Sequence, residues 1–489
     1  MKRIFALLLS FVAFLSGCSK NDGFGGFWGG YEEQAGDRYT EYGENGFLNT
    51  SENPVSTFSV DADGASFACA RFYINHGQIP PAAAVRVEEY LNYFTFKYPE
   101  PTDGENVSLS SEMTICPWNT AHYLLKLGMK GRTIAPEQMP SSNYVFLIDV
   151  SGSMEGVDRL ALLKSGFMRM ADHLSPNDRI SIVTYSGEVK TLLDSANGNQ
   201  VKEIKAAISK LKASGCTNGG DAIKRAYNLA AKNFITGGNN RIILGTDGDF
   251  NFGITSQEKL IELVEQKLES GIYLTVLGVG SGNLNESMME QLANHGNGNY
   301  EYIDCVEQLD KVFINEAQRF HTVAKDSKLQ LTFNSESVAQ YRLIGYENRT
   351  LNKEDFDDDK KDAGEIGSGQ TITALYELVP TNSGNELIAN WEFRYKKPAE
   401  SESRLLQHKI TSAQVDPINC NCISEDMNLA ASLAAFGMIL KGSPYKGTAD
   451  ATMVRSLASG TTTFDPFGYR QAYIDLLNKW NGEGNTTKQ

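Results

Sequence analysis

The chain has 489 residues, enough for about two to four domains. It carries 45 Lys and Arg against 60 Asp and Glu, a formal net charge of −15. This acidic balance argues against nucleic acid and anionic lipid surfaces as partners. Apolar residues make up 41% of the chain, which is the share of an ordinary globular protein.

The first residues have the pattern of a secretory signal. Lys2 and Arg3 precede the apolar run Ile4 to Phe14, which is shorter than the roughly 20 residues of a spanning helix. The following Leu15-Ser16-Gly17-Cys18 resembles the lipobox of bacterial lipoproteins, in which the cysteine is acylated and becomes the mature N-terminus. The resemblance implies a signal peptide over residues 1–17 and a lipid anchor on Cys18. The alternative is an ordinary secretory signal with a chance cysteine.

The expected address is therefore the bacterial cell envelope, with the chain held at a membrane by lipid. Ser19 stands where many lipoproteins retained at the inner membrane carry aspartate, which favours the outer membrane. Whether the protein faces the periplasm or the cell surface stays open. The other cysteines form no obvious disulfide framework, and we interpret most as small buried residues with one or two disulfides left open: Cys69, Cys116, Cys216, Cys305, Cys420 and Cys422.

Residues 18–52 are rich in Gly, Asn, Glu and Tyr, a composition that predicts a flexible tether. An N-terminal flanking module is expected over residues 53–142. Its pattern predicts a strand at Ser56–Val60, helices at Ser66–His76 and Ala84–Phe96, and half-buried strands over 107–130.

Residues 143–322 alternate strand and helix patterns with short connections. This alternation predicts a doubly wound, mostly parallel α/β sheet with helices on both faces and a ligand site at the carboxyl ends of the strands. The strands are expected at Tyr144–Ile148, Arg179–Tyr185, Arg241–Thr246, Ile272–Val279 and near Tyr300. The helices are expected at Leu160–Leu174, Val201–Leu211, Ala222–Asn233, Gln257–Leu268, Ser287–Asn294 and Val306–Phe320.

A β-rich module is expected over residues 323–412, with Leu329–Phe333 as its clearest strand, and a helical region over 413–489. Leu429–Leu440 is apolar nearly all round, which predicts a buried helix. The strand-rich flanks 107–142 and 323–412 either pair into one sandwich, with the α/β domain inserted between them, or fold separately.

Polar residues gather where the buried strands of the α/β domain end. The first strand runs into Asp149-Val150-Ser151-Gly152-Ser153, and another ends at Thr246-Asp247-Gly248. Thr217 lies between them in the chain, in a loop that precedes a helix. A buried strand has no reason to end in an acid and two hydroxyls unless these groups meet something polar. Their oxygen atoms suit a hard cation such as Mg²⁺ or Mn²⁺, with Ca²⁺ also compatible.

The D-x-S-x-S sequence, followed by Thr217 and Asp247 in this order, resembles the metal-ion-dependent adhesion site of von Willebrand factor type A domains, which are Rossmann-like. The resemblance implies that Ser151, Ser153 and Thr217 ligate the metal, while Asp149 and Asp247 act directly or through water. It also implies an open coordination position for a carboxylate of a protein or glycan partner. Asn218 and Asp249 are expected at the rim. Cys216 departs from the family pattern and is interpreted as a buried, inert thiol.

The resemblance continues outside this domain. Ser56–Asp63, Val85–Phe94, Asp362–Gly367 and Ala434–Met438 look like the flanking modules of a family of bacterial von Willebrand type A lipoproteins, so that the likeness covers roughly residues 53–480. The expected function is non-enzymatic, metal-dependent binding. The alternatives are a metal-dependent hydrolase, which would need a general base that the motif loops do not supply, and an adaptor or assembly factor of an envelope complex.

Overall fold

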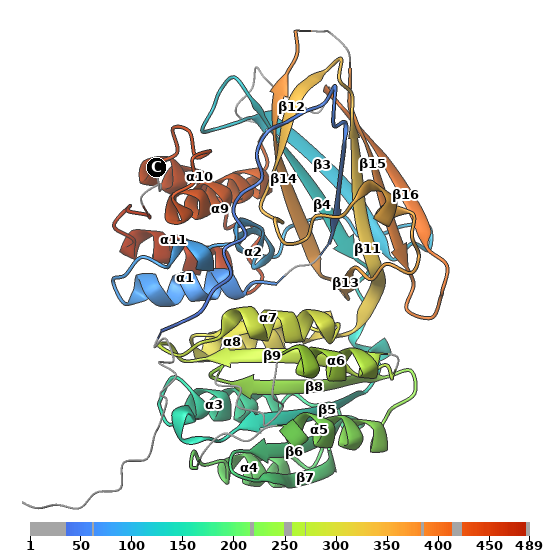
Figure 1. The fold of residues 1–489 in the computed structure, drawn as a ribbon, viewed down its shortest axis with the longest axis vertical. Helices are drawn as coiled ribbons and strands as arrows, with labels where there is room; N and C mark the ends of the chain where they lie inside the picture. The colour runs from blue at the N-terminus through green and yellow to red at the C-terminus, as the bar shows by residue number, and fades with distance from the viewer. Residues whose placement is uncertain are drawn as a thin grey trace, which may run out of the picture. The chain divides into compact units, whose positions relative to one another are not determined.

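The computed structural model describes residues 36–60, 63–215, 220–248, 257–268, 270–382, 386–412 and 423–485. These residues belong to one structural unit that begins at Gly36. It contains an α/β domain, a β-sandwich and a cluster of helices (Figure 1). In the described residues, no helix combines the length and the apolar run that crossing a bilayer requires.

The α/β domain is built on one sheet with the strand order β10-β9-β8-β5-β6-β7. Neighbouring strands are parallel except β6 and β7, which pair antiparallel at one edge. The doubly wound, mostly parallel fold is therefore confirmed, and β7 is an edge strand that the sequence pattern did not predict. The strands are β5 (Ser142–Asp149), β6 (Arg179–Tyr185), β7 (Val189–Asn197), β8 (Asn239–Thr246), β9 (Tyr273–Val279) and β10 (Tyr300–Ile303).

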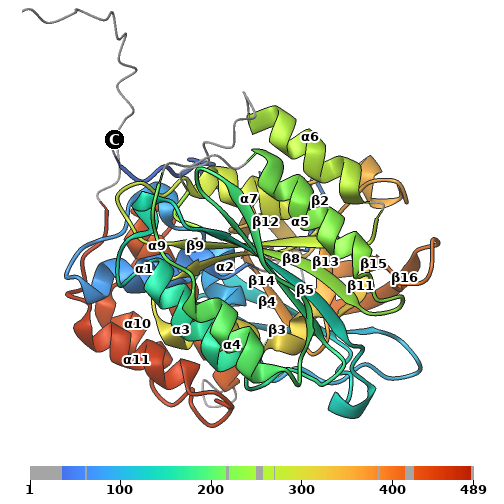
Figure 2. The same cartoon turned by 90° about the horizontal axis from the view of Figure 1, so that it is seen from below.

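Helices cover both faces of this sheet (Figure 2). Side chains alternate along β5, so Val145 and Leu147 pack with α5, α6 and α7, while Phe146 and Ile148 pack on the other face with α3, α4 and α8. The helices are α3 (Leu160–Met170), α4 (Val201–Ser209), α5 (Gly220–Lys232), α6 (Gln257–Leu268), α7 (Glu286–His295) and α8 (Val306–Asp310).

The expected continuous helix from Val306 to Phe320 is wrong. Helix α8 ends at Asp310, a π-turn follows over Lys311–Asn315, and a 3-10 turn covers Ala317–Phe320. Lys311 is buried, forms an ion pair with Glu316, and lies over the rings of Tyr93 and Tyr469 at 4.7 and 4.4 Å. The Glu316 amide donates to the Lys311 carbonyl at 2.9 Å, five residues back, so the ion pair and the wider turn occur together.

The strand-rich flanks pair into one sandwich, and the α/β domain is inserted between them (Figure 1). Strand β4 from before the insertion pairs with β14 from after it, and β2 pairs with β11 in the second sheet. One apolar core lies between the sheets and includes Leu127, Leu331 and Trp391. The first sheet contains β1 (Leu48–Asn49), β12 (Val338–Ile344), β14 (Thr371–Pro380), β4 (Tyr123–Gly131) and β3 (Val107–Ile115). The second contains β2 (Val55–Ser59), β11 (Thr322–Phe333), β13 (Gly364–Gly367), β15 (Leu387–Lys396) and β16 (Arg404–Thr411).

Helices from both ends of the chain share a core. The buried helix α9 is longer than expected; Ser424 caps its first turn by accepting from the Met427 amide, and Gly442 at φ +76° ends it. The expected helix at Ala84–Phe96 is reduced to a 3-10 turn at Ala82–Ala84 and a short α2. The cluster contains α1 (Ala65–Asn75), α2 (Val87–Asn92), α9 (Glu425–Lys441), α10 (Ala451–Ala458) and α11 (Tyr469–Lys479).

Residues 36–49, which we call the strap, lie on the folded body, so the predicted tether over 18–52 extends too far. Asp37 Oδ1 accepts from the amides of Gly282 and Leu284 at 2.7 and 2.9 Å, and the strap ends in β1, which pairs with β12. In Figure 1 the strap is the blue segment that leads from the α/β domain to the sandwich. Residues 18–35 lie outside the described part of the chain.

Candidate metal centre

Two acidic residues meet at the carboxyl edge of the sheet. Asp149 is the last residue of β5, and Asp247 follows the last residue of the neighbouring strand β8. Both are buried, with 0% and 2% of their surface exposed. Because parallel neighbours end at the same edge, two positions almost 100 residues apart in the chain become one site.

The loop after β5 folds back on its own acid. The Ser151 amide donates to Asp149 Oδ1 at 2.8 Å, and the hydroxyls of Ser151 and Ser153 lie 3.0 Å apart. On the other strand, the Gly248 amide donates to the Thr246 hydroxyl at 3.1 Å. The four predicted residues that the structure describes are therefore brought together: Asp149, Ser151, Ser153 and Asp247.

The segment that carries Thr217 begins beside this loop. The Ser214 amide donates to the Val150 carbonyl at 2.8 Å, and the Gly152 amide donates to the Gly215 carbonyl at 2.9 Å. Thr217, Asn218 and Asp249 themselves lie outside the described residues, as do Cys18 and Cys216. Cys69, Cys116 and Cys305 are free thiols, so the disulfide left open does not form among them.

Burial, and the repulsion between the carboxylates of Asp149 and Asp247, disfavour the charged form of Asp149. Burial raises the pKa of Asp149 to about 6; the charge of Asp247 adds to the rise, while hydrogen bonds from Ser151 oppose it. The guanidinium of Arg159 lies 3.8 Å from Asp247 Oδ2 and donates hydrogen bonds to the carbonyls of Ser153 and Ser281. No sequence pattern predicted a role for Arg159, which lies six residues beyond the motif.

These residues fit a hard divalent cation. The donor set combines two buried carboxyl groups with hydroxyls, and a doubly positive ion would relieve the repulsion between the carboxylates. In the described residues no group of three or more His, Cys, Asp and Glu side chains is placed to hold a metal, so a soft, thiolate- or imidazole-rich centre has no support there.

The sheet edge that carries Asp149 and Asp247, called the metal edge below, contacts the rest of the protein through α7. Gly248 has φ +94°, and a Cβ atom there would lie 2.5 Å from the amide nitrogen of Asn285, the N-cap residue of α7. Only glycine permits both this conformation and this approach. The strap reaches the same helix, where the Thr40 hydroxyl donates to Ser287 Oγ at 2.6 Å.

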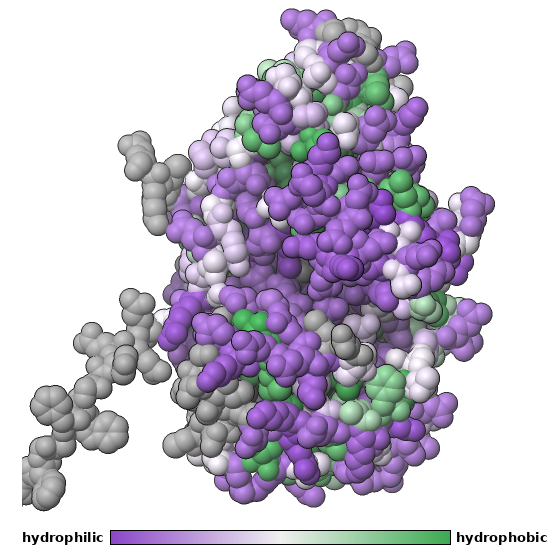
Figure 3. Space-filling view, turned by 45° about the vertical axis from the view of Figure 1, so that its right-hand side comes forward, coloured by the Kyte–Doolittle hydropathy of each residue, from purple (hydrophilic) through white to green (hydrophobic). Residues whose placement is uncertain are grey.

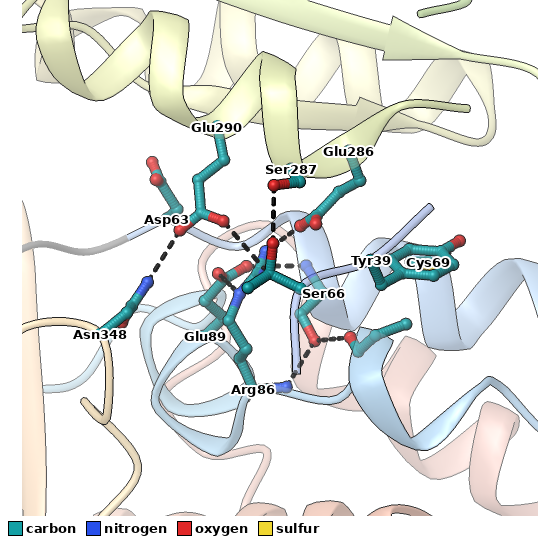
Figure 4. Close-up of polar contacts among 12 residues, drawn as sticks. Tyr39, Asp63, Ser66, Cys69, Arg86, Glu89, Glu286, Ser287, Glu290 and Asn348 are labelled. Carbon is teal, nitrogen blue, oxygen red and sulfur yellow. Dashed lines mark hydrogen bonds and ion pairs between the residues drawn. The ribbon is translucent and has the colours of Figure 1, made fainter. Parts of the chain in front are cut away.

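A buried charge cluster holds α7 against the helical cluster (Figure 4). The guanidinium of Arg86 forms ion pairs with Glu89 of its own module and Glu286 of α7, and lies 3.3 Å from Glu290. Asn348, from the sandwich, donates to Glu290 Oε1 at 2.8 Å. All three parts of the protein therefore meet at α7, one helix away from the candidate metal centre.

In the part of the chain that the structure describes, the exposed large apolar side chains are Tyr42, Leu48, Val157, Phe234, Leu405 and Phe467. On the face drawn in Figure 3, hydrophilic residues dominate and apolar ones form separate small patches. Val157 is the most exposed large apolar residue recorded, at 88%, and it lies in the loop that leads from Ser153 to Arg159. Val157 is therefore four residues from Ser153 in the chain and open to solvent.

Comparison with known proteins defines the class. A family model described as von Willebrand factor type A domain matches residues 143–313, and one described as von Willebrand factor matches residues 33–126. A third, described as "Uncharacterized protein YfbK, C-terminal", matches residues 318–482. With the observed fold, these matches define a von Willebrand factor type A domain protein that carries characteristic flanking modules.

The relatives give the particular family. The YfbK protein of Escherichia coli strain K12 is 39% identical over 473 residues, which cover 91% of this chain and 81% of that protein. The chain belongs to the YfbK family, which confirms the predicted likeness to a bacterial von Willebrand factor type A protein with flanking modules; the lipid anchor stays a prediction.

More distant similarities cover less. Inter-alpha-trypsin inhibitor heavy chain H3 of Homo sapiens is 30% identical over 225 residues, 44% of this chain and 23% of that protein. Among solved structures, von Willebrand factor type A from Catenulispora acidiphila is 16% identical with a TM-score of 0.44, and the match covers 79% of this chain and 91% of that one.

Proposed function

We propose that the protein is a non-enzymatic binding protein of the bacterial envelope that docks an acidic group of a protein partner on one divalent metal, Mg²⁺ in the first place. Asp149, Ser151, Ser153, Thr217 and Asp247 would hold the ion. The observation that carries the proposal is the pair of buried acids, Asp149 and Asp247, at one sheet edge beside two hydroxyls. When bound, the metal supplies positive charge and a coordination position for a carboxylate.

The remaining residues of the edge prepare this docking. The amide of Ser151 fixes the Asp149 carboxylate, and Arg159 ties the loop to the β9–α7 turn through Ser153 and Ser281. Val157 offers an apolar contact beside the metal. Specificity would then come from the rim, while the metal supplies a directional anchor.

The composition of the edge favours binding over hydrolysis. Its described segments, residues 149–159, 185–188, 214–215, 246–248 and 280–285, contain no histidine, lysine or cysteine. A metal-dependent hydrolase needs a general base or nucleophile close to the ion, so histidine, lysine and cysteine do not fill that role in these segments, and the proposal assigns Asp149 and Asp247 to the metal. The proposed envelope location rests on the signal segment and the lipobox-like sequence at Cys18, and the choice of the outer membrane rests on Ser19.

The test is a titration of the full-length protein with Mg²⁺ and Mn²⁺ by isothermal calorimetry. Asp149→Asn keeps the side-chain volume and removes the charge, and Glu155→Gln on the exposed rim is the matched control. We expect saturable binding by the wild type and by Glu155→Gln, and a loss of at least tenfold in affinity for Asp149→Asn. Equal affinity for all three proteins would refute the metal centre.

The partner is sought by crosslinking in intact cells with the same proteins, each in Mg²⁺ and in chelator. A partner recovered by the wild type and Glu155→Gln in Mg²⁺ alone supports metal-dependent docking. Equal recovery in chelator, or by Asp149→Asn, would mean that the metal centre is not the docking site.

A further inference from the structure

A cavity of about 560 Å³ lies away from the metal edge, where the strap, the helical cluster and the sandwich meet. The strap forms one wall with Thr40 to Glu44, and the segment from Ala82 to Glu88 forms another. The turn after α9 and the loop after β12 complete it with Lys441, Gly442, Pro444, Tyr445, Asn485, Glu347 and Asn348. Its volume is that of a small-molecule site.

One oxygen of a buried carboxyl group in this cavity has no hydrogen-bond partner, although the charge of Arg86 and backbone amides partly stabilise the group. Glu88 is 4% exposed, and its Oε2 has no hydrogen-bond partner. Glu347, from the loop after β12, lies close enough for its charge to raise the pKa of Glu88 further, after the larger effect of burial. A buried carboxylate oxygen without a partner is costly, and a bound positive charge would reduce that cost.

The cations that line the cavity already have partners. Arg86 forms ion pairs with Glu89 and Glu286, and Lys441 Nζ donates to the Gly43 carbonyl at 2.9 Å. The acids of the lining exceed the bases: Glu41, Glu44, Glu88 and Glu347 face Arg86 and Lys441. An anionic ligand would meet net repulsion there, and a neutral one would leave the charge of Glu88 only partly stabilised.

The remaining lining is mostly apolar or aromatic, with the polar residues Thr40, Asn348 and Asn485. Ala82, Ala83 and Val85 line the cavity from the segment between α1 and α2. Tyr42 lines it from the strap, and Pro444 and Tyr445 line it from the turn after α9. Acidic groups within a largely apolar cavity match an organic cation with an aliphatic body.

We propose that this cavity is a binding site for a small aliphatic amine, whose ammonium group pairs with Glu88 and Glu347 while its carbon chain contacts the apolar lining. The site is distinct from the metal edge and does not depend on it. Within Val85–Glu89, Arg86 and Glu89 therefore contact α7 or its partners in the ion-pair cluster, and Glu88 lines the cavity.

The amine should also compete with a proton. The pKa of Glu88 is raised to about 7, by burial first and by Glu347 next, so the empty site is partly protonated at neutral pH. If the bound ammonium requires the charged carboxylate, affinity should rise about tenfold between pH 6 and pH 8. The ionisable groups that face Glu88 in the cavity are Tyr42, Glu41, Glu44, Arg86, Glu347 and Lys441.

The probe is n-hexylamine, with 1-hexanol as the uncharged control of equal length. Binding to the full-length protein is measured by isothermal calorimetry at pH 8 with chelator present, so the metal edge plays no part. We expect a Kd of about 1 mM or below for the amine and binding at least tenfold weaker for the alcohol. Glu88→Gln and Glu347→Gln should each weaken amine binding at least tenfold, and the exposed Glu137→Gln, which does not line the cavity, should leave it unchanged.

A second route to the same site avoids the acids altogether. Ala83→Phe places a ring at the half-buried wall of the cavity, and it should abolish binding of the amine while leaving Glu88 and Glu347 in place. Thermal unfolding of each variant confirms that it is folded. Equal binding of amine and alcohol, no binding of the amine at all, or unchanged amine affinity in these three cavity variants would overturn the proposal without touching the metal-dependent function.

Discussion

Replacing Arg86 by methionine should loosen the junction between the α/β domain and the helical cluster. Methionine keeps an unbranched apolar stem but removes the guanidinium that pairs with Glu89 and Glu286 and lies 3.3 Å from Glu290. All four side chains are at most 6% exposed, so water cannot take over the role of the lost charge.

The magnitude follows from this burial. Removing one partner of a buried ion pair costs about 3–5 kcal/mol, because the remaining charges stay in a medium of low polarity. Burial already raises the pKa of Glu286 to about 7 despite Arg86, so the carboxyl can be neutralised by proton uptake in the variant. That uptake becomes harder by about 1.4 kcal/mol for each unit of pH, so the loss should be larger at pH 8 than at pH 6.

Urea unfolding at both pH values measures the loss. With a slope of about 3 kcal/mol per molar or more for a protein of this size, the midpoint should fall by roughly 1 M at pH 8. Adding Glu286→Gln to Arg86→Met should recover part of the loss, because the double variant no longer buries that unpaired acid. An unchanged midpoint at pH 8, or an equal loss at pH 6 and pH 8, would refute the reasoning.

Three further predictions concern separate parts of the protein. Glu88→Gln should stabilise the protein at high pH. The pKa of Glu88 is about 7 in the folded protein and 4.5 in the unfolded chain, so the wild type loses stability as the pH rises through that window. Thermal unfolding should show a gain on the order of 2–3 kcal/mol at pH 8 and none near pH 4, and equal gains at both would contradict this origin. Gly166→Ala should cost about 1–3 kcal/mol, since its Cβ would lie 2.3 Å from Leu309 Cδ1, whereas Gly187→Ala, with open space around it, should be neutral in the same assay. Val157→Asp should leave unfolding unchanged and weaken metal-dependent crosslinking to the partner, because it adds negative charge at the rim where a carboxylate approaches; undiminished crosslinking would remove Val157 from the docking surface.

The α/β domain could be predicted from the sequence because its signals are local. The apolar run before Asp149 could only be a buried strand, and the acid at its end marked the edge at which ligands bind. Asp247 likewise follows a buried strand, β8. Because parallel neighbouring strands end at the same edge, the sequence already predicted that Asp149 and Asp247 lie close together. Thr217 stays a prediction, because it lies outside the described residues.

Other structural features depend on contacts between residues that are distant in the chain, and no local sequence pattern predicts them. The strap looks like a polar tether, yet Asp37 finds two amide donors in the β9–α7 turn, roughly 245 residues away. The π-turn after α8 depends on Lys311 reaching Tyr93 and Tyr469 of the helical cluster. Arg86 similarly meets acids of its own helix and of α7, and its sequence neighbourhood predicts only a helix start.

The attachment of the strap has a mechanical consequence for a chain anchored at Cys18. Asp37 is bonded to Gly282 and Leu284, and the next residues of that turn lead to Asn285, which abuts Gly248 beside Asp247. With the proposed acyl anchor at Cys18 and a partner docked on the proposed metal, tension would pass from the strap through the β9–α7 turn to the sheet edge, and would bypass the sandwich and the helical cluster. The bonds of Asp37 and of its neighbour Arg38 would be loaded first, because the Arg38 backbone is also hydrogen-bonded to Leu284 and Glu286.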